Sequence, residues 1–94
     1  MVMHFPHQRK LPRPFELPWG RGVVVEEVSI LRPHWEPTIQ LLEYEDGSVA
    51  LRFCYYHGSR FGRGPMILSK EDIADMKTAA QNSPRIKALL RGFA

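Results

Sequence analysis

The residues of this chain that could do chemistry are concentrated between positions 52 and 63, where basic and aromatic side chains are interleaved. The six candidates are Arg52, Tyr56, His57, Arg60, Phe61 and Arg63. Proteins hold single-stranded nucleic acid with basic groups that follow the phosphates and with aromatic rings on which bases stack. We therefore expect the three arginines to contact phosphates, Tyr56 and Phe61 to stack on bases, and His57 to add charge at mildly acidic pH. An alternative has equal weight on the residues alone: a solvated basic loop whose Phe61 folds back onto the core.

The cysteine and the histidines lack the spacing of a metal site. Cys54 and His57 stand three apart, but Cys54 is the only thiol, and on a strand it points away from His57. Zinc normally needs four ligands, or three plus water, at paired spacings. We therefore expect no metal and interpret Cys54 as a small apolar residue on a sheet face.

No set of catalytic groups emerges either. Glu26 and Glu27 are adjacent, so they face opposite sides of a strand, whereas Glu43 and Glu45 share a face near a predicted turn, where carboxylates are usually solvated. The glycine-rich residues 58–64 lack the Gly-Lys-Ser/Thr ending of a phosphate-binding loop. We expect a protein that is not an enzyme and that uses no cofactor.

A β-hairpin must position the candidate residues. Two strand-like runs, residues 38–45 and 48–56, are separated by an Asp-Gly dipeptide, which favours a two-residue type I′ turn. Such a turn pairs Leu42 with Leu51 on the predicted core face and puts Leu41 on the opposite, mixed face.

The remaining elements complete a small α+β domain. Residues 23–31 are rich in β-branched side chains and predict a strand, and residues 65–68 predict a short final strand. Residues 1–22 form a basic arm interrupted by four prolines, which we expect to be flexible or laid along the surface, with order beginning at Val23. The predicted fold over residues 23–94 is a small antiparallel sheet of three to four strands, followed by one long helix and a second, short C-terminal helix.

Two helix starts are visible after this sheet. Ser69 with Asp72 has the pattern of a capping box, and Ser83 followed by Pro84 is typical of a second start. The second helix carries an apolar stripe made of Ile86, Leu89, Leu90 and Phe93. We expect this stripe either to form an oligomer or partner interface or to complete the core of the monomer, which is the commoner use of such a stripe.

The composition limits the class of protein. The 94 residues are 44% hydrophobic and 24% charged, with a net charge of +3 and basic ends on either side of an acidic segment at 26–46. This charge distribution is compatible with a polyanionic partner. We see no apolar run of the ~20 residues that a membrane span needs and no secretory signal, and a single cysteine fits a reducing compartment. We expect an intracellular protein, cytoplasmic or associated with the nucleoid, with no membrane contact.

The stretch at residues 37–80 resembles the single-stranded DNA-binding domain of transcriptional coactivators of the positive cofactor four family. The resemblance rests on the hairpin TIQLLEYEDGSVALRFCYY, the following GRGPMILS and the acidic helix start KEDIADMKTAA. It implies an antiparallel sheet leading into a helix, a homodimer, and binding of single-stranded DNA or RNA. Arg63 falls where that family has a basic residue before its last strand, and Tyr56 and His57 fall on its aromatic pair.

Overall fold

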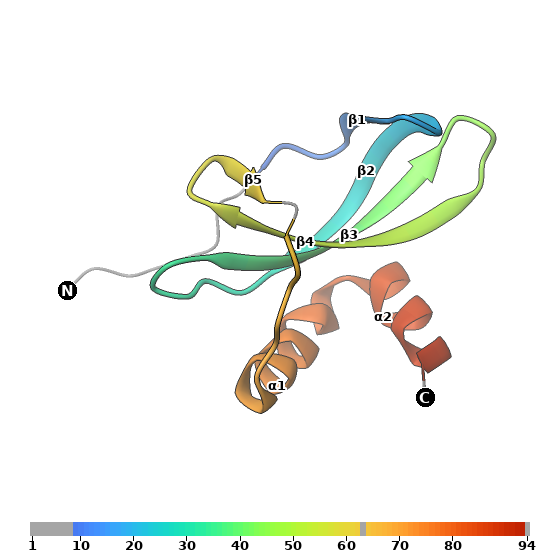
Figure 1. Cartoon of the computed structure of the whole chain (residues 1–94). Coiled ribbons are helices and arrows are strands. Elements are labelled where there is room, and N and C mark those ends of the chain that lie inside the picture. The colour runs from blue at the N-terminus through green and yellow to red at the C-terminus, as the bar shows by residue number, and fades with distance from the viewer. Residues whose placement is uncertain (1–8, 63, 94) are drawn as a thin grey trace.

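The computed structural model describes residues 9–62 and 64–93 and has an antiparallel sheet followed by two helices. The strands are β1 (Arg13–Leu17), β2 (Gly20–Ser29), β3 (Glu36–Tyr44), β4 (Val49–His57) and β5 (Arg60–Gly62), in the spatial order β1-β2-β3-β4-β5. The helices are α1 (Lys70–Ala79) and α2 (Pro84–Leu90), each continued by a short 3₁₀ turn, η1 (Ala80–Asn82) and η2 (Arg91–Phe93). The sheet curls so that both helices cover one face while β1 and β5, its edge strands, lie on the other side (Figure 1).

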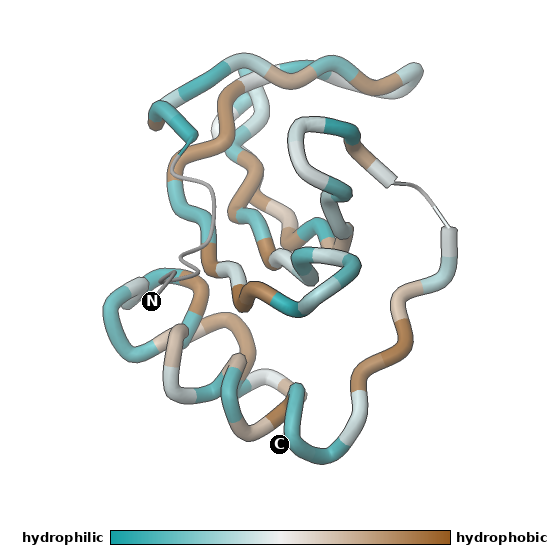
Figure 2. The backbone as a smooth tube through the Cα atoms, turned by 90° about the vertical axis from the view of Figure 1, so that its left-hand side faces the viewer, coloured by the Kyte–Doolittle hydropathy of each residue, from teal (hydrophilic) through white to brown (hydrophobic). Residues whose placement is uncertain are grey.

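The α+β class is confirmed, but the sheet is larger and the first helix shorter than the sequence predicts. The described sheet has five strands rather than three to four, and α1 has ten residues. Residues 65–68 form no strand, and the last strand is β5 instead. Figure 2 shows the extended segment at 64–69 running from the sheet to α1 with hydrophobic residues in its middle. None of the helices in the described ranges is long and apolar enough to cross a membrane.

Strand structure begins earlier than Val23, the predicted start. β1 begins at Arg13, and β2 begins at Gly20. Pro14 lies within β1 opposite Val23, a position that proline tolerates because β1 is an edge strand and one row of its N–H groups needs no partner. Residues 1–8 of the predicted arm lie outside the described residues.

The hairpin between β3 and β4 has a three-residue loop, so the predicted two-residue turn is wrong. The N–H of Gly47 donates to the carbonyl of Tyr44 at 2.9 Å, and the N–H of Tyr44 donates to the carbonyl of Ser48 at 2.8 Å. Gly47 has φ of 88°, the left-handed conformation that such a loop needs at its last residue. The carboxylate of Asp46 fixes the longer loop by accepting from the N–H of Ser48 at 2.9 Å.

The longer loop shifts the pairing by one residue and exchanges the faces of the sheet. Leu41 pairs with Leu51 and Ile39 with Phe53, and this set faces the helices. Leu42, predicted on the same core face as Leu51, lies instead on the side of the sheet away from the helices, where it is buried in a second, smaller cluster. One residue of slip reverses every side chain of a strand, because the side-chain period is two.

The main core lies between the sheet and the helices. It contains Val28, Ile39, Leu41, Met76 and Ile86, each exposed by 4% or less. Burial of such side chains is the dominant favourable contribution to folding, at roughly 1.5–3 kcal/mol each. Met76 of α1 and Ile86 of α2 therefore hold the two helices against the sheet.

The two helices begin differently: α1 has a capping box, whereas the first N–H groups of α2 bond a carboxylate of the sheet. The Ser69 hydroxyl accepts from the N–H of Asp72, and the Asp72 carboxylate accepts from the N–H of Ser69, both at 3.0 Å, which confirms the predicted capping box. Pro84 occupies the first turn of α2 as predicted, but Ser83 makes no side-chain cap bond. A carboxylate from the sheet, that of Glu26, replaces it.

Candidate nucleic-acid interface

The open side of the curled sheet contains a cleft between β1 and the β4–β5 pair, with a volume of about 590 Å³. We call it the edge-strand cleft. The side chains of interest that line it are Arg13, Phe15, Glu16, Trp19, Arg52, Tyr56 and Phe61. The cleft exists because the sheet curls, which brings strands distant in sequence to opposite walls.

A network of buried polar side chains lies beneath the cleft. The carboxylate of Glu27 accepts from Arg13 at 2.5 Å and from the amide of Gln40 at 2.6 Å. Arg13 and Gln40 also donate to the Tyr56 hydroxyl, at 3.3 and 3.0 Å, and Arg52 donates to the Gln40 amide oxygen at 2.7 Å. Gln40 is fully buried, so this network fixes the position of Arg52 from below.

A second ion pair extends the network toward the start of the described chain. Arg9 donates two parallel hydrogen bonds to the carboxylate of Glu36, at 3.1 and 3.0 Å, and Glu36 is only 1% exposed. Burial alone would lower the pKa of Arg9, but the hydrogen bond and charge of Glu36, together with Glu27, outweigh it and raise that pKa. The Arg9 guanidinium also lies 3.5 Å from the centroid of the Tyr56 ring. The buried carboxylates are thus neutralised by arginines.

The structure brings two of the candidate residues, Arg52 and Phe61, together in the cleft. The Arg52 guanidinium lies 4.9 Å from the centroid of the Phe61 ring, and Phe61 is 39% exposed. Within residues 9–62 and 64–93, Arg52 forms no ion pair with a carboxylate, so its charge is available to a ligand.

Tyr56 does not fit its predicted role as a stacking ring. It is 8% exposed, one face is covered by the Arg9 guanidinium, and the Phe61 ring meets it edge-on with centroids 5.4 Å apart. A base could reach it only by displacing Arg9. Its hydroxyl acts within the polar network instead.

Two other candidates lie on the face of the sheet away from the cleft. His57 and Arg60 pair with each other in register and so share a face, which is opposite the face that carries Tyr56 and Phe61. The Nδ1 of His57 donates to the carbonyl oxygen of His34 at 2.6 Å. Arg60 is exposed, and Arg63 lies outside the described residues.

Trp19 is a cleft residue that the sequence interpretation missed. Its ring is 74% exposed in the tight connection between β1 and β2, where its Nε1 donates to the Tyr44 hydroxyl at 3.4 Å. The sequence does contain a signal for this position. Trp19 stands between Pro18 and Gly20, a turn-like setting in which a large ring is expected to stay exposed rather than enter the core.

Cys54 is buried on the cleft side of the sheet, 4% exposed. Burial raises the pKa of its thiol to about 11, which leaves it protonated and unreactive at neutral pH. No group of three or more metal-ligating side chains occurs in the described part of the chain.

The apolar stripe of the C-terminal helix is divided between core and surface. Ile86 is fully buried and Leu90 packs against the main core, as the core interpretation expects. Leu89 is 41% exposed and Phe93 is 77% exposed, so only these two are open to an interface.

Comparison of this chain with models of known protein families, with curated proteins and with solved structures finds no match.

Proposed function

We propose that this protein binds single-stranded nucleic acid, without catalysis, in the edge-strand cleft. The observation that carries the proposal is the pairing of Arg52 with the exposed Phe61 ring in an open cleft, with Trp19 also at its wall. The guanidinium supplies a phosphate contact, and the two rings supply the flat apolar surfaces on which unpaired bases stack.

The geometry favours a single strand over a duplex. Phe61 lies on edge strand β5 and Trp19 follows edge strand β1, and both line the same cleft. A base can stack on these rings only when it is unpaired and no longer stacked in a duplex. Glu16 also lines the cleft, and its negative charge repels a phosphate. The positive charge of Arg52 is therefore needed to hold a phosphate there.

The resemblance of residues 37–80 to the coactivator family supports the same function and suggests a role in transcription. At the hairpin tip, where that family has basic residues, Glu45 is paired with Arg21 at 2.8 Å and Asp46 bonds Ser48. The acidic tip is thus partly neutralised within the chain, which reduces its repulsion of a bound strand.

Fluorescence anisotropy with a labelled single strand of about 20 nucleotides and the matching duplex tests the proposal. With one phosphate contact, from Arg52, and a slope near −0.7 per contact, affinity should fall about 2.6-fold between roughly 50 and 200 mM salt. Arg52→Gln and Phe61→Ala should each weaken binding, whereas Arg91→Gln on the helix-covered face is the matched control and should change it little. Equal affinity for the duplex, or equal loss with Arg91→Gln, would refute binding in this cleft.

A homo-oligomeric interaction domain is the second candidate function. It is favoured by the exposure of Leu89 and Phe93 beside each other at the end of the chain. Sedimentation velocity should then show a dimer that becomes a folded monomer in the Leu89→Gln/Phe93→Gln variant. A wild-type protein that is monomeric at every concentration would exclude this function.

A further inference from the structure

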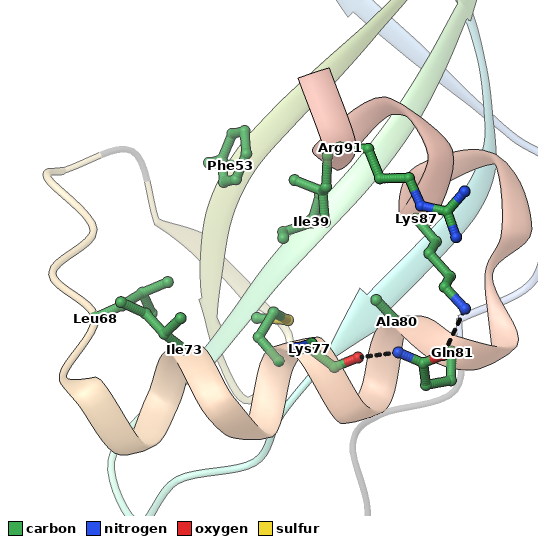
Figure 3. Close-up of a pocket in the computed structure, with 11 residues that line it drawn as sticks. Ile39, Phe53, Leu68, Ile73, Lys77, Ala80, Gln81, Lys87 and Arg91 are labelled. Carbon is green, nitrogen blue, oxygen red and sulfur yellow. Dashed lines mark hydrogen bonds between the residues drawn. The ribbon is translucent and has the colours of Figure 1, made fainter. Parts of the chain in front are cut away.

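The helix-covered face carries an open groove where α1, α2 and the middle of the sheet meet (Figure 3). Its volume is about 360 Å³, and its floor is formed by Ile39, Met76 and Ala80, each exposed by 4% or less. Figure 3 shows Ile73 at one end and Arg91 at the other. We call it the helix-face groove; it lies on the opposite face of the sheet from the edge-strand cleft.

The apolar surface extends beyond the groove itself. Ile73 is 58% exposed and Phe53 is 43% exposed, although both line the groove. The Phe53 ring meets the Phe93 ring edge-on with centroids 6.4 Å apart, and Phe93 is 77% exposed. Small-molecule pockets enclose most of their ligand, whereas these walls are themselves open to solvent. A surface of this kind suits a macromolecular partner.

The rim of the groove is basic. Lys77, Lys87 and Arg91 line it, and no carboxylate is present among its lining residues. The Lys87 ammonium donates to the side-chain oxygen of Gln81 at 2.6 Å, and none of the three cations forms an ion pair within the described part of the chain. An apolar floor with an uncompensated basic rim is complementary to a segment that combines apolar side chains with carboxylates.

We propose that the helix-face groove binds an acidic amphipathic helix of a partner protein. Such a helix places apolar residues at i, i+3 or i+4, and i+7 into the groove, and its flanking Asp and Glu residues lie beside the three rim cations. Residues 1–8 of this chain contain no carboxylate and so do not match the rim. A nucleic-acid strand matches the groove less well, because the floor residues Ile39, Met76 and Ala80 offer no ring for stacking and Phe53 is the one aromatic side chain among the described lining residues.

The test uses the full chain and a labelled synthetic peptide of about 16 residues, because shorter helices are marginal in water. The probe has leucines at helical spacing flanked by glutamates, and two matched peptides replace either the leucines by alanine or the glutamates by lysine. Anisotropy should show binding of the first peptide only. Ile73→Gln should weaken binding about tenfold, which corresponds to about 1.4 kcal/mol, close to the contribution of burying one isoleucine side chain. Ile67→Gln, an equally apolar but more exposed position outside the groove, should have no effect.

The charge contribution is tested separately. Lys77→Glu and Arg91→Glu should each weaken binding of the acidic peptide, and Lys70→Glu, in α1 but outside the groove, should not. Because Ile73 and Arg91 are exposed or at the rim, these variants are expected to keep the wild-type circular dichroism spectrum. The proposal would be overturned if the acidic peptide failed to bind, or if Ile73→Gln left its binding unchanged. It would also be overturned if the wild-type protein were a dimer that did not bind the peptide and Ile73→Gln made it a monomer, because the groove would then belong to a second copy of the chain. Displacement of the peptide by a labelled single strand would do the same by assigning it to nucleic acid.

Discussion

Glu27 is expected to be the residue of the polar network on which stability depends most. Its side chain is 7% exposed and it holds Arg13 at 2.5 Å and Gln40 at 2.6 Å, with Arg9 at 3.7 Å. Replacing Glu27 by alanine removes a negative charge that neutralises two partly buried arginines. Breaking a buried ion pair in this way lowers the free energy of unfolding by about 3–5 kcal/mol. Because the Arg13 side chain is 23% exposed and can turn toward water, we expect the lower end of that range, about 3 kcal/mol.

A loss of this size is easy to measure in a chain of 94 residues, whose total stability is expected to be about 5–14 kcal/mol. With a urea dependence of about 1–2 kcal/mol per molar, the unfolding midpoint should fall by about 1.5 M or more. Glu16→Ala, on the exposed surface of β1, is the matched control and should change the free energy of unfolding by about 0.5 kcal/mol or less. In the Arg13→Ala/Glu27→Ala double variant the loss should be at least about 1 kcal/mol smaller than the sum of the single losses. If Glu27→Ala behaved like Glu16→Ala, or if the two losses were additive, the network would not be the stabilising unit described above.

Three further predictions test other parts of the fold. Burial raises the pKa of Cys54 to about 11, so a thiol reagent at about pH 8 should label it only at the rate of unfolding; rapid labelling of the native protein would contradict its placement. The backbone N–H at the start of α1 and the Arg32 guanidinium lower the pKa of Asp72 from its ordinary 3.8, so its stabilising contribution is complete above that value and is lost as the pH falls through the lower folded value. The difference in urea midpoint between wild type and Asp72→Asn should therefore be full at about pH 6 and shrink as the pH falls below 3.8, and a constant difference would exclude this linkage. A Cβ on Gly22 would lie 1.9 Å from a carbonyl oxygen of β3, so Gly22→Ala should lower the free energy of unfolding by about 1–3 kcal/mol or more. Gly92→Ala, whose Cβ meets open space, should change it by no more than about 0.5 kcal/mol. Equal effects of the two variants in thermal unfolding would be inconsistent with the close approach of β2 to β3.

Local signals in the sequence predicted the helix starts well and the hairpin only in part. The capping box at Ser69 and the proline at Pro84 depend on neighbours within three residues, so the sequence contains all the information needed. The Asp-Gly dipeptide is compatible with loops of two or three residues. What selects the longer loop is the Asp46 carboxylate bonding the N–H of Ser48, together with the left-handed Gly47. That choice decides which residues of β4 share a face with Ile39 and Leu41 of β3.

The candidate site was predictable where its parts are close in sequence and not where they are distant. Arg52 and Phe61 belong to neighbouring strands and were found together. The partners of the arginines near the N-terminus are 14 to 27 residues away, at Glu27 and Glu36. The sequence alone therefore predicts a proline-rich basic arm that is flexible or laid along the surface. Tyr56 was assigned to the ligand for the same reason, since only the folded chain places Arg9 over its ring.

A single irregularity in β2 connects the two faces of the sheet. Val24 and Val28 are four apart, so a regular strand would put them on one face, yet Val24 packs with the cleft-side cluster and Val28 with the helix-side core. The register shift between Val24 and Glu26 is the cause, because one extra residue in the strand reverses the alternation beyond it. It also turns Glu26 toward α2, whose Ile86 N–H it accepts at 3.0 Å, and Glu27 into the polar network below Arg52. Two adjacent carboxylates thus hold a helix on one face and the proposed nucleic-acid site on the other, so a change in this part of β2 is expected to perturb both.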